Sequence, residues 1–165
     1  MAKKFIILAF ICVVKTTFAS QAILPHQENI KNAQLICAVK VLTQKTESKN
    51  STIMTHSTVK PILCFKGSVS TDLEIEWAGG VLGEKRTVIA GAPKLKVDDA
   101  AILYLTREKD SEPYIITNWA QGVIPLEKAP NSDEYQVPKK YVKGLKLEGQ
   151  RLEDYATFLA RLSSK

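Results

Sequence analysis

Few side chains in this chain are of the types that carry out chemistry, and their spacing matches no catalytic or metal-binding pattern. The two histidines, His26 and His56, stand far apart and lack the H-x₃-H or C-x-x-C spacing of zinc sites. The sequence contains no G-x-S-x-G or H-E-x-x-H motif, no phosphate-binding loop and no dinucleotide fingerprint. We therefore predict a protein that is not an enzyme and that uses no cofactor or metal; a small hydrolytic enzyme is the weaker alternative.

Two pairs of carboxylates deserve a structural interpretation before a catalytic one. In the segment DLEIEW, strict alternation places Glu74 and Glu76 on the solvent side of a predicted strand. Asp98 and Asp99 are adjacent, so their side chains point apart, and they precede a strongly apolar segment. We interpret the first pair as a solvated strand face and the second as a turn, and His56 as a solvent-facing strand histidine.

A second group of residues has the types found at binding surfaces, where tryptophan and arginine are enriched and glycine allows close approach. The predicted binding residues are Trp77, Gly79, Gly80, Arg86, Trp119, Gln121 and Gly122. A purely structural interpretation competes with this one. Trp77 shares a strand face with Leu73 and Ile75 and would then belong to the core, while the glycines would only make turns.

The N-terminus is typical of a cleaved export signal. Lys3 and Lys4 precede an unbroken apolar run over 5–14, and small residues at Thr17 and Ala19 predict a cut before Ser20. The run is about half of the ~20 residues that span a bilayer, so residues 1–19 form a signal peptide and no stable membrane insertion remains after cleavage. We expect an exported protein, located in the periplasm or outside the cell.

The remaining chain has the size of one domain and a mild charge. Removing residues 1–19 takes away three lysines and no acidic residue, which lowers the formal net charge from +6 to +3. No run of basic residues interleaved with aromatic residues is present, so we expect no nucleic-acid partner. Residues 20–32 form an N-terminal leader without a sustained period, and 33–165 form a single domain.

After signal cleavage two cysteines remain, Cys37 and Cys64. An even number of cysteines in an oxidising compartment predicts a disulfide, with two buried free thiols as the alternative. Closing this loop would stabilise the folded state by about 3.5 kcal/mol in the chain-entropy model.

The period of the apolar residues predicts a mainly β domain. Segments 33–44 and 52–65 form a long hairpin whose turn contains Asn50, and folding it there places Cys37 opposite Cys64. Pro61 marks an edge position or a bulge. Further strands are expected over 72–77, 86–90, 100–106, 114–118, 122–126 and near 135–137, separated by turn residues.

Only the C-terminal end has a helical period. Apolar residues recur at steps of three and four over 150–163, which predicts an amphipathic helix that packs its apolar side on the sheet. The fold class is therefore mainly β: a small antiparallel barrel of the OB-like or netrin-like kind with one C-terminal α-helix.

Several short motifs in 33–127 resemble those of a group of small exported bacterial domains of unknown function. They are Val39-Lys40-Val41, Phe65-Lys66-Gly67, Trp77-Ala78-Gly79-Gly80, Gly91-Ala92-Pro93, the apolar segment 102–105, and Gln121-Gly122. The strand order with a K-G step after the second strand is also similar to netrin-like domains, which are OB-type barrels that include the inhibitors of metalloproteinases. The mature N-terminus Ser20-Gln21 lacks the cysteine with which those inhibitors chelate zinc, so that mechanism does not carry over.

These features together predict an exported, non-enzymatic binding or accessory domain that recognises a protein or an envelope component. The resemblance to netrin-like domains implies the alternative, an inhibitor or accessory factor of a secreted hydrolase.

Overall fold

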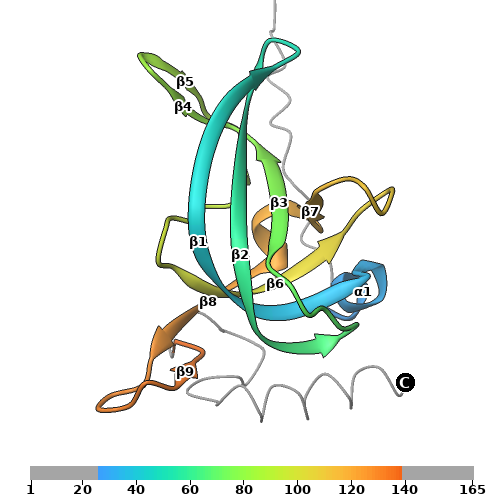
Figure 1. Cartoon of the computed structure of the whole chain (residues 1–165), viewed down its shortest axis with the longest axis vertical. Coiled ribbons are helices and arrows are strands. Elements are labelled where there is room, and N and C mark those ends of the chain that lie inside the picture. Colours follow the sequence, from blue (N-terminus) through green and yellow to red (C-terminus); the bar gives the residue numbers. More distant parts are fainter. Residues whose placement is uncertain (1–25, 139–165) are drawn as a thin grey trace, which may run out of the picture.

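The structure is a computed structural model that describes residues 26–138, and this part is mainly β (Figure 1). The predicted signal peptide 1–19 and the predicted helix 150–163 lie outside the described residues. The elements in chain order are α1 (His26–Asn32), β1 (Leu35–Lys49), β2 (Thr52–Lys66), β3 (Leu73–Ala78), β4 (Gly80–Leu82), β5 (Lys85–Thr87), β6 (Ala100–Thr106), β7 (Tyr114–Ile116), the 3₁₀-helix η1 (Trp119–Gly122), β8 (Val123–Lys128) and β9 (Tyr135–Gln136).

The main sheet closes on itself through β1. Its order is β1-β2-β3-β7-β6-β8-β9, and an additional pairing joins β1 to β6, so that β1, β2, β3, β7 and β6 form a ring of five strands. Four of the five pairings in this ring are antiparallel, but β3 and β7 run parallel. The expectation of an antiparallel sheet is therefore corrected at this one place, where Ile75 lies beside Tyr114.

The predicted hairpin is present and spans most of the length of the described part (Figure 1). Its turn contains Asn50 and Ser51, which both adopt left-handed backbone conformations with φ of 50° and 65°. Asparagine tolerates this region better than most residues. The pairing places Lys49 opposite Thr52 and, after two register shifts, still places Cys37 opposite Cys64; a third shift follows between Cys37 and Ile36.

The two cysteines form a disulfide, as predicted from their number. It joins β1 to β2 at the end of the hairpin far from the turn. Pro61 lies beside one of the bulges: Ala38 of β1 pairs with Leu63, and the next residue, Val39, pairs with Pro61, so that one residue of β2 has no partner on β1. A proline has no N–H for the ladder, so a bulge is a position that tolerates it.

The ring encloses one apolar core, and its outer side carries a second. Alternate residues of β1 point inward, among them the fully buried Cys37, Val39 and Val41. The intervening residues Ile36 and Ala38 point outward, where they pack with side chains of β6 and β8. Because successive side chains of a strand point to opposite faces, β1 contributes residues to both clusters.

Helix α1 covers part of this outer cluster, although residues 20–32 were predicted to form an N-terminal leader. Its Ile30 is buried there together with Ala33, which follows the helix. The ammonium of Lys66, on β2, donates to the carbonyls of Ile30 and Ala33 at 2.9 and 2.5 Å. The last carbonyls of a helix lack partners inside it, so Lys66 acts as its C-terminal cap.

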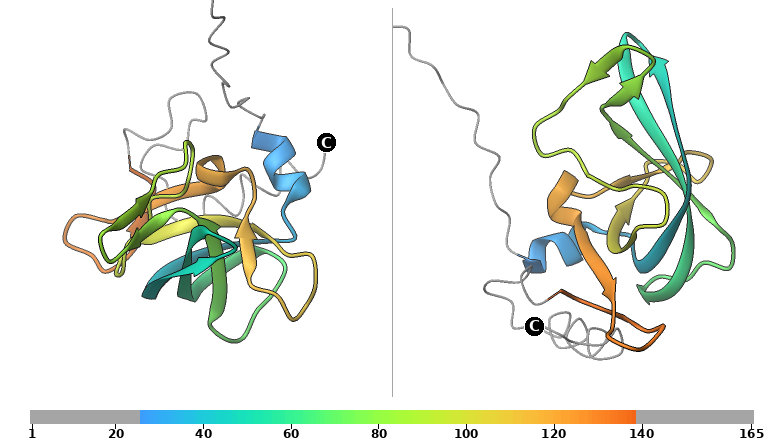
Figure 2. Two further views of the ribbon diagram at one scale, coloured as in Figure 1. Left: turned by 90° about the horizontal axis from the view of Figure 1, so that it is seen from above. Right: turned by 90° about the vertical axis from the view of Figure 1, so that its left-hand side faces the viewer.

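The short hairpin of β4 and β5 was not predicted. It forms a separate two-stranded sheet with Gly80 opposite Thr87 and projects beside the turn of the long hairpin (Figures 1 and 2). Thr46 of β1 anchors it by donating from Oγ1 to the Val81 carbonyl at 2.6 Å. The predicted strand over 86–90 is therefore shorter, and residues 88–99 form a loop.

The remaining strands agree with the apolar pattern. Strand β6 is central and buried over Ala100–Leu105, as expected for the most apolar segment. Along β3, Leu73, Ile75 and Trp77 are buried on the inner face. A three-residue β7, β8 and a short β9 lie within or next to the segments predicted for them.

Gly122 fills a position at the start of β8 where no side chain fits. A Cβ added there would lie 2.1 Å from the Thr117 carbonyl oxygen, far closer than real contacts allow. Its role is therefore close packing between η1 and the end of β7, rather than a turn with positive φ.

We predict that removing the disulfide lowers the free energy of unfolding by about 3 kcal/mol, because the unfolded chain gains freedom. The measurement is urea denaturation of the mature protein and of the variant C37A/C64A. Reductant should lower the midpoint of the wild type and leave that of the variant unchanged; a wild-type midpoint that ignores reductant contradicts the prediction.

We predict that Gly122→Ala destabilises the protein by about 3 kcal/mol, because the Thr117 backbone must move. Gly83→Ala is the matched control, since Gly83 has φ of +59° but nothing within 4 Å of its added Cβ. It should cost only about 1 kcal/mol, the cost of the left-handed conformation. Equal thermal denaturation shifts for both variants would show that packing does not govern Gly122.

Candidate functional site

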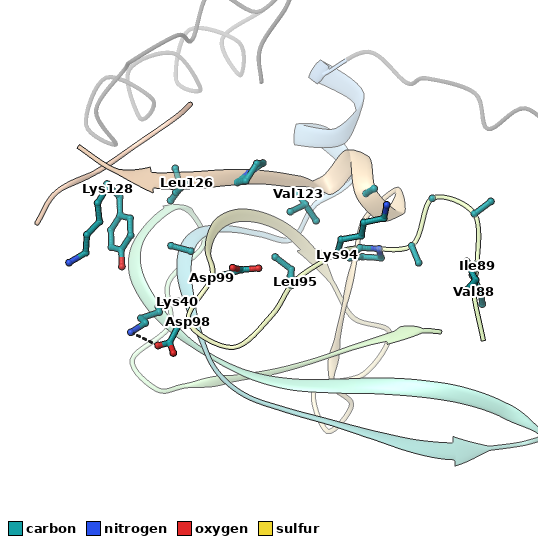
Figure 3. A pocket seen from close by; sticks show the side chains of 18 residues that line it. Lys40, Val88, Ile89, Lys94, Leu95, Asp98, Asp99, Val123, Leu126 and Lys128 are labelled. Atoms are coloured by element: carbon teal, nitrogen blue, oxygen red, sulfur yellow. Dashed lines mark ion pairs between the residues drawn. The ribbon is translucent and has the colours of Figure 1, made fainter. Parts of the chain in front are cut away.

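A groove of about 1010 Å³ lies on the side of the ring where β8 lies (Figure 3). The loop 88–99 forms one wall, and β8 with Ala120 of η1 forms the other. Lys40 of β1 and Tyr135 of β9 complete one end, together with Asp98 and Asp99. We define this cavity, with these walls, as the groove.

Hydrogen bonds from two elements, η1 and β1, hold the loop in place. The Ala120 amide of η1 donates to the Gly91 carbonyl at 2.9 Å, and Gly91 turns the chain with φ of 77°. The Gln44 side chain of β1 donates from Nε2 to the Leu95 carbonyl at 3.0 Å. The Leu95 side chain is itself part of the inner core, so the loop is anchored by packing as well as by hydrogen bonds.

The charged end of the groove is built by the turn before β6. Asp98 has a left-handed backbone with φ of 71°, and its amide donates to the Val41 carbonyl at 3.0 Å. Its carboxylate meets the Lys40 ammonium at 2.9 Å. This pairing, chiefly the hydrogen bond to Asp98, raises the pKa of Lys40 above its ordinary value. Asp99 accepts from the Lys96 amide at 2.8 Å, which confirms the predicted turn.

Two further lysines lie along the groove (Figure 3). Lys128 is paired with Asp133 at 2.6 Å, and that hydrogen bond raises the pKa of Lys128. Lys94 has no hydrogen-bond or ion-pair partner within residues 26–138. Its ammonium is thus the cation at the groove whose charge is least compensated.

The walls of the groove are mainly apolar. They are formed by alanine, valine, isoleucine, leucine and proline side chains, and Val88 is 74% exposed. In the described part of the chain, no serine, cysteine or histidine lines the groove. Such a surface can bind an apolar group next to an acidic one.

The structure brings four of the predicted binding residues together in a smaller pocket of about 230 Å³. Trp77, Gly79, Gly80 and Arg86 all line it, between β3, the short hairpin and the loop 88–99. Trp77 also lines a third pocket, of about 240 Å³, where it is joined by Trp119. Gln121 and Gly122 line none of these three cavities.

The glycines among these residues have structural reasons for their positions. The Gly79 amide donates to the Ile53 carbonyl at 2.7 Å, and the Gly79 carbonyl accepts from Thr55 Oγ1 at 2.6 Å. A Cβ on Gly80 would lie 2.6 Å from the same Oγ1. The structural interpretation of Gly79, Gly80 and Gly122 therefore accounts for them without a ligand.

A cluster around His56 on the outer face of β2 was not foreseen. Glu47 Oε1 lies 3.2 Å from His56 Nε2, and Glu76 Oε2 lies 3.7 Å from Nδ1. The Lys49 ammonium lies 3.5 Å from the same Glu76 oxygen. His56 and Glu76 were expected to be solvated, but their side chains are only 14% and 16% exposed. Cross-strand neighbours from three strands bury them, which the pattern of one strand cannot show.

This cluster does not form a metal site. Within 26–138, no three histidine, cysteine, aspartate or glutamate side chains are grouped so as to hold a metal ion. Among the helices described, none has the length and apolar character needed to cross a membrane.

Sequence reasoning missed the groove. Lys40, Lys94 and Lys128 are scattered along the chain, and only the ring brings them to one surface. One signal was available: Val88 and Ile89 are apolar and β-branched, yet they stand beside the Gly91-Ala92-Pro93 bend. Apolar residues in a loop that cannot bury them are typical of a binding surface.

Comparisons with protein-family models, with curated proteins and with solved structures give no match for this chain. The resemblances stated from its short motifs stay predictions, and any function has to be argued from the geometry of the described residues.

Proposed function

We propose that this protein is an exported, non-enzymatic binding domain that recognises a protein or an envelope component through the groove. The observation that carries the proposal is a cavity of about 1010 Å³ with apolar walls and lysines at its edge. Ligand sites of about 300–1,000 Å³ with a few convergent polar groups are typical of binding proteins. The disulfide is compatible with a protein that matures in an oxidising compartment.

We further propose that the ring is a barrel of the OB type. In support, β6 returns beside β1, so that β6, β1, β2 and β3 lie in the spatial order of a Greek key. A five-stranded Greek-key barrel is the architecture of OB-folds, whose strands and connecting loops bind varied ligands. The same architecture serves many activities, so the site, and not the fold, determines the proposal.

The groove favours a partner that presents an apolar group followed by a carboxylate. Val88, Leu126 and the alanines along the walls provide apolar contact, and Lys94 supplies an uncompensated positive charge. Lys40 and Lys128 are already neutralised by Asp98 and Asp133. A single acidic contact at Lys94 then fixes the orientation of the partner, while the apolar walls supply most of the contact area.

We predict that a photo-reactive residue in the groove captures a defined partner in the producing cell. Val88→p-benzoylphenylalanine should give one dominant adduct because Val88 is exposed at the groove wall. Ile62→p-benzoylphenylalanine is the control, since Ile62 is 43% exposed on β2 and lines none of the cavities. The measurement is the adduct pattern after irradiation, with the partner identified by mass spectrometry.

With the partner identified, Lys94→Glu should weaken its binding about tenfold, which corresponds to about 1.4 kcal/mol. Lys31→Glu, a charge reversal of an exposed lysine on α1, should leave the affinity unchanged. Identical adducts from Val88 and Ile62, or equal affinities for both charge reversals, would remove the groove as the binding site.

A further inference from the structure

The short hairpin of β4 and β5 carries an exposed apolar residue on each of its two faces. Val81 pairs with Arg86 across the hairpin, and Leu82 pairs with Lys85, so each apolar side chain lies beside a basic one. Because successive residues of a strand point to opposite faces, the two pairs lie on opposite faces. Val81 is 56% exposed and Leu82 is 37% exposed. Each face of the hairpin thus combines apolar and cationic surface.

The base of the hairpin is packed, whereas its apex is open. At the base, a Cβ on Gly80 would lie 2.6 Å from Thr55 Oγ1. Thr46 also holds the base through its hydrogen bond to the Val81 carbonyl. At the apex, a Cβ on Gly83 would meet no atom within 4 Å. The hairpin therefore projects near the turn of the long hairpin with an apex that is free to meet a partner (Figures 1 and 2).

The positive charge of the hairpin is not neutralised by the protein. The side chains of Lys85 and Arg86 have no hydrogen-bond or ion-pair partner within residues 26–138. Arg86 lines the pocket of about 230 Å³, where Lys94 is a second cation and no aspartate or glutamate is among the described lining residues. Over 77–97 the sequence contains four basic residues and one acidic residue, Glu84, which leaves a net charge of +3. This charge is complementary to an anionic surface.

A partner that covers both apolar residues has to contact both faces of the hairpin. A flat protein surface would cover one face, whereas the interfacial region of a bilayer surrounds a tip that enters it. We infer that the hairpin binds the surface of a bilayer that contains anionic lipids. Val81 and Leu82 then lie at the boundary between headgroups and acyl chains, and Lys85 and Arg86 lie beside lipid phosphates.

This surface goes beyond the groove and is separate from it. None of the four hairpin residues Val81, Leu82, Lys85 and Arg86 lines the groove. Failure of the bilayer contact therefore leaves the groove intact as the binding site, and failure of the groove leaves the bilayer contact intact.

Cosedimentation with lipid vesicles tests the inference. The mature protein is mixed with extruded vesicles of phosphatidylcholine alone, or of phosphatidylcholine and phosphatidylglycerol in equal parts. Binding to the anionic vesicles should be at least about tenfold tighter and should weaken as the NaCl concentration is raised, because salt screens the attraction. Equal binding to both kinds of vesicle, or binding to neither, overturns the inference. A polypeptide adduct from Val88→p-benzoylphenylalanine without vesicle binding would support the groove and refute the bilayer contact.

Charge variants locate the contact. Lys85→Gln/Arg86→Gln should weaken binding to the anionic vesicles about thirtyfold, which corresponds to about 2 kcal/mol for two cations near the surface. The matched control is Lys31→Gln/Lys60→Gln, which removes the same charge from exposed positions on α1 and β2. The control should change the binding by less than about threefold, because these lysines lie outside the hairpin. Equal losses for both double variants would show that the net charge, and not the hairpin, governs binding.

The apolar contribution has its own variants. Val81→Ser/Leu82→Ser should weaken vesicle binding about tenfold, because less apolar area enters the interface. The control Ile62→Ser/Leu63→Ser changes residues of β2 that are 43% and 39% exposed, and it should bind as the wild type does. Glu84→Gln should strengthen binding about fivefold, because it removes the acidic group at the apex. Urea denaturation checks that each variant folds, and if one hairpin variant does not fold, the other decides. Vesicle binding that survives both hairpin variants overturns the assignment.

Discussion

The ring depends on the ability of β1 to pair with two strands at once. Residues 35–40 of β1 are hydrogen-bonded to β6, and residues 36–49 are hydrogen-bonded to β2. One strand can belong to both parts of the ring only if it bends, and the three register shifts between β1 and β2 provide that bend. The disulfide fixes the pairing at Cys37, next to the first of these shifts. Closure of the sheet, and with it the placement of the cavities, follows from this one strand.

The parts of the fold that the sequence predicted are those governed by local patterns. Asn50 indicates the turn of the long hairpin. Because the residue numbers of paired positions in a hairpin have a nearly constant sum, this turn places Cys37 beside Cys64. The apolar content of 100–105 likewise predicts a central strand. The parallel pairing of β3 and β7 could not be predicted, because it joins two-residue stretches that are distant in the chain. Helix α1 was missed because seven residues are too few for a helical period to emerge.

The candidate site was predicted only in part, for a related reason. Tryptophan, arginine and glycine residues were chosen by type, and the structure groups Trp77, Gly79, Gly80 and Arg86 around one pocket. Types alone do not separate ligand contacts from packing, and the added-Cβ distances assign Gly80 and Gly122 to packing. The role of the loop 88–99 as a wall of the groove was not predicted, because it depends on hydrogen bonds from η1 to Gly91 and from β1 to Leu95, which join residues distant in the chain. Both the groove and the pocket that contains Trp77 and Trp119 use this loop or its neighbour η1 as a wall.

The cap that Lys66 provides for α1 bears on the order in which the chain acquires structure. A helix of seven residues is unstable by itself in water, so α1 needs the ammonium of Lys66 and the outer faces of β1 and β6. Lys66 is the last residue of β2, and β6 comes later still. Helix α1 precedes these strands in the chain and therefore becomes stable only after the hairpin and the central strand have formed. Until then residues 26–32 lack the contacts that hold them in a helix and are accessible to any factor that binds an unfolded segment.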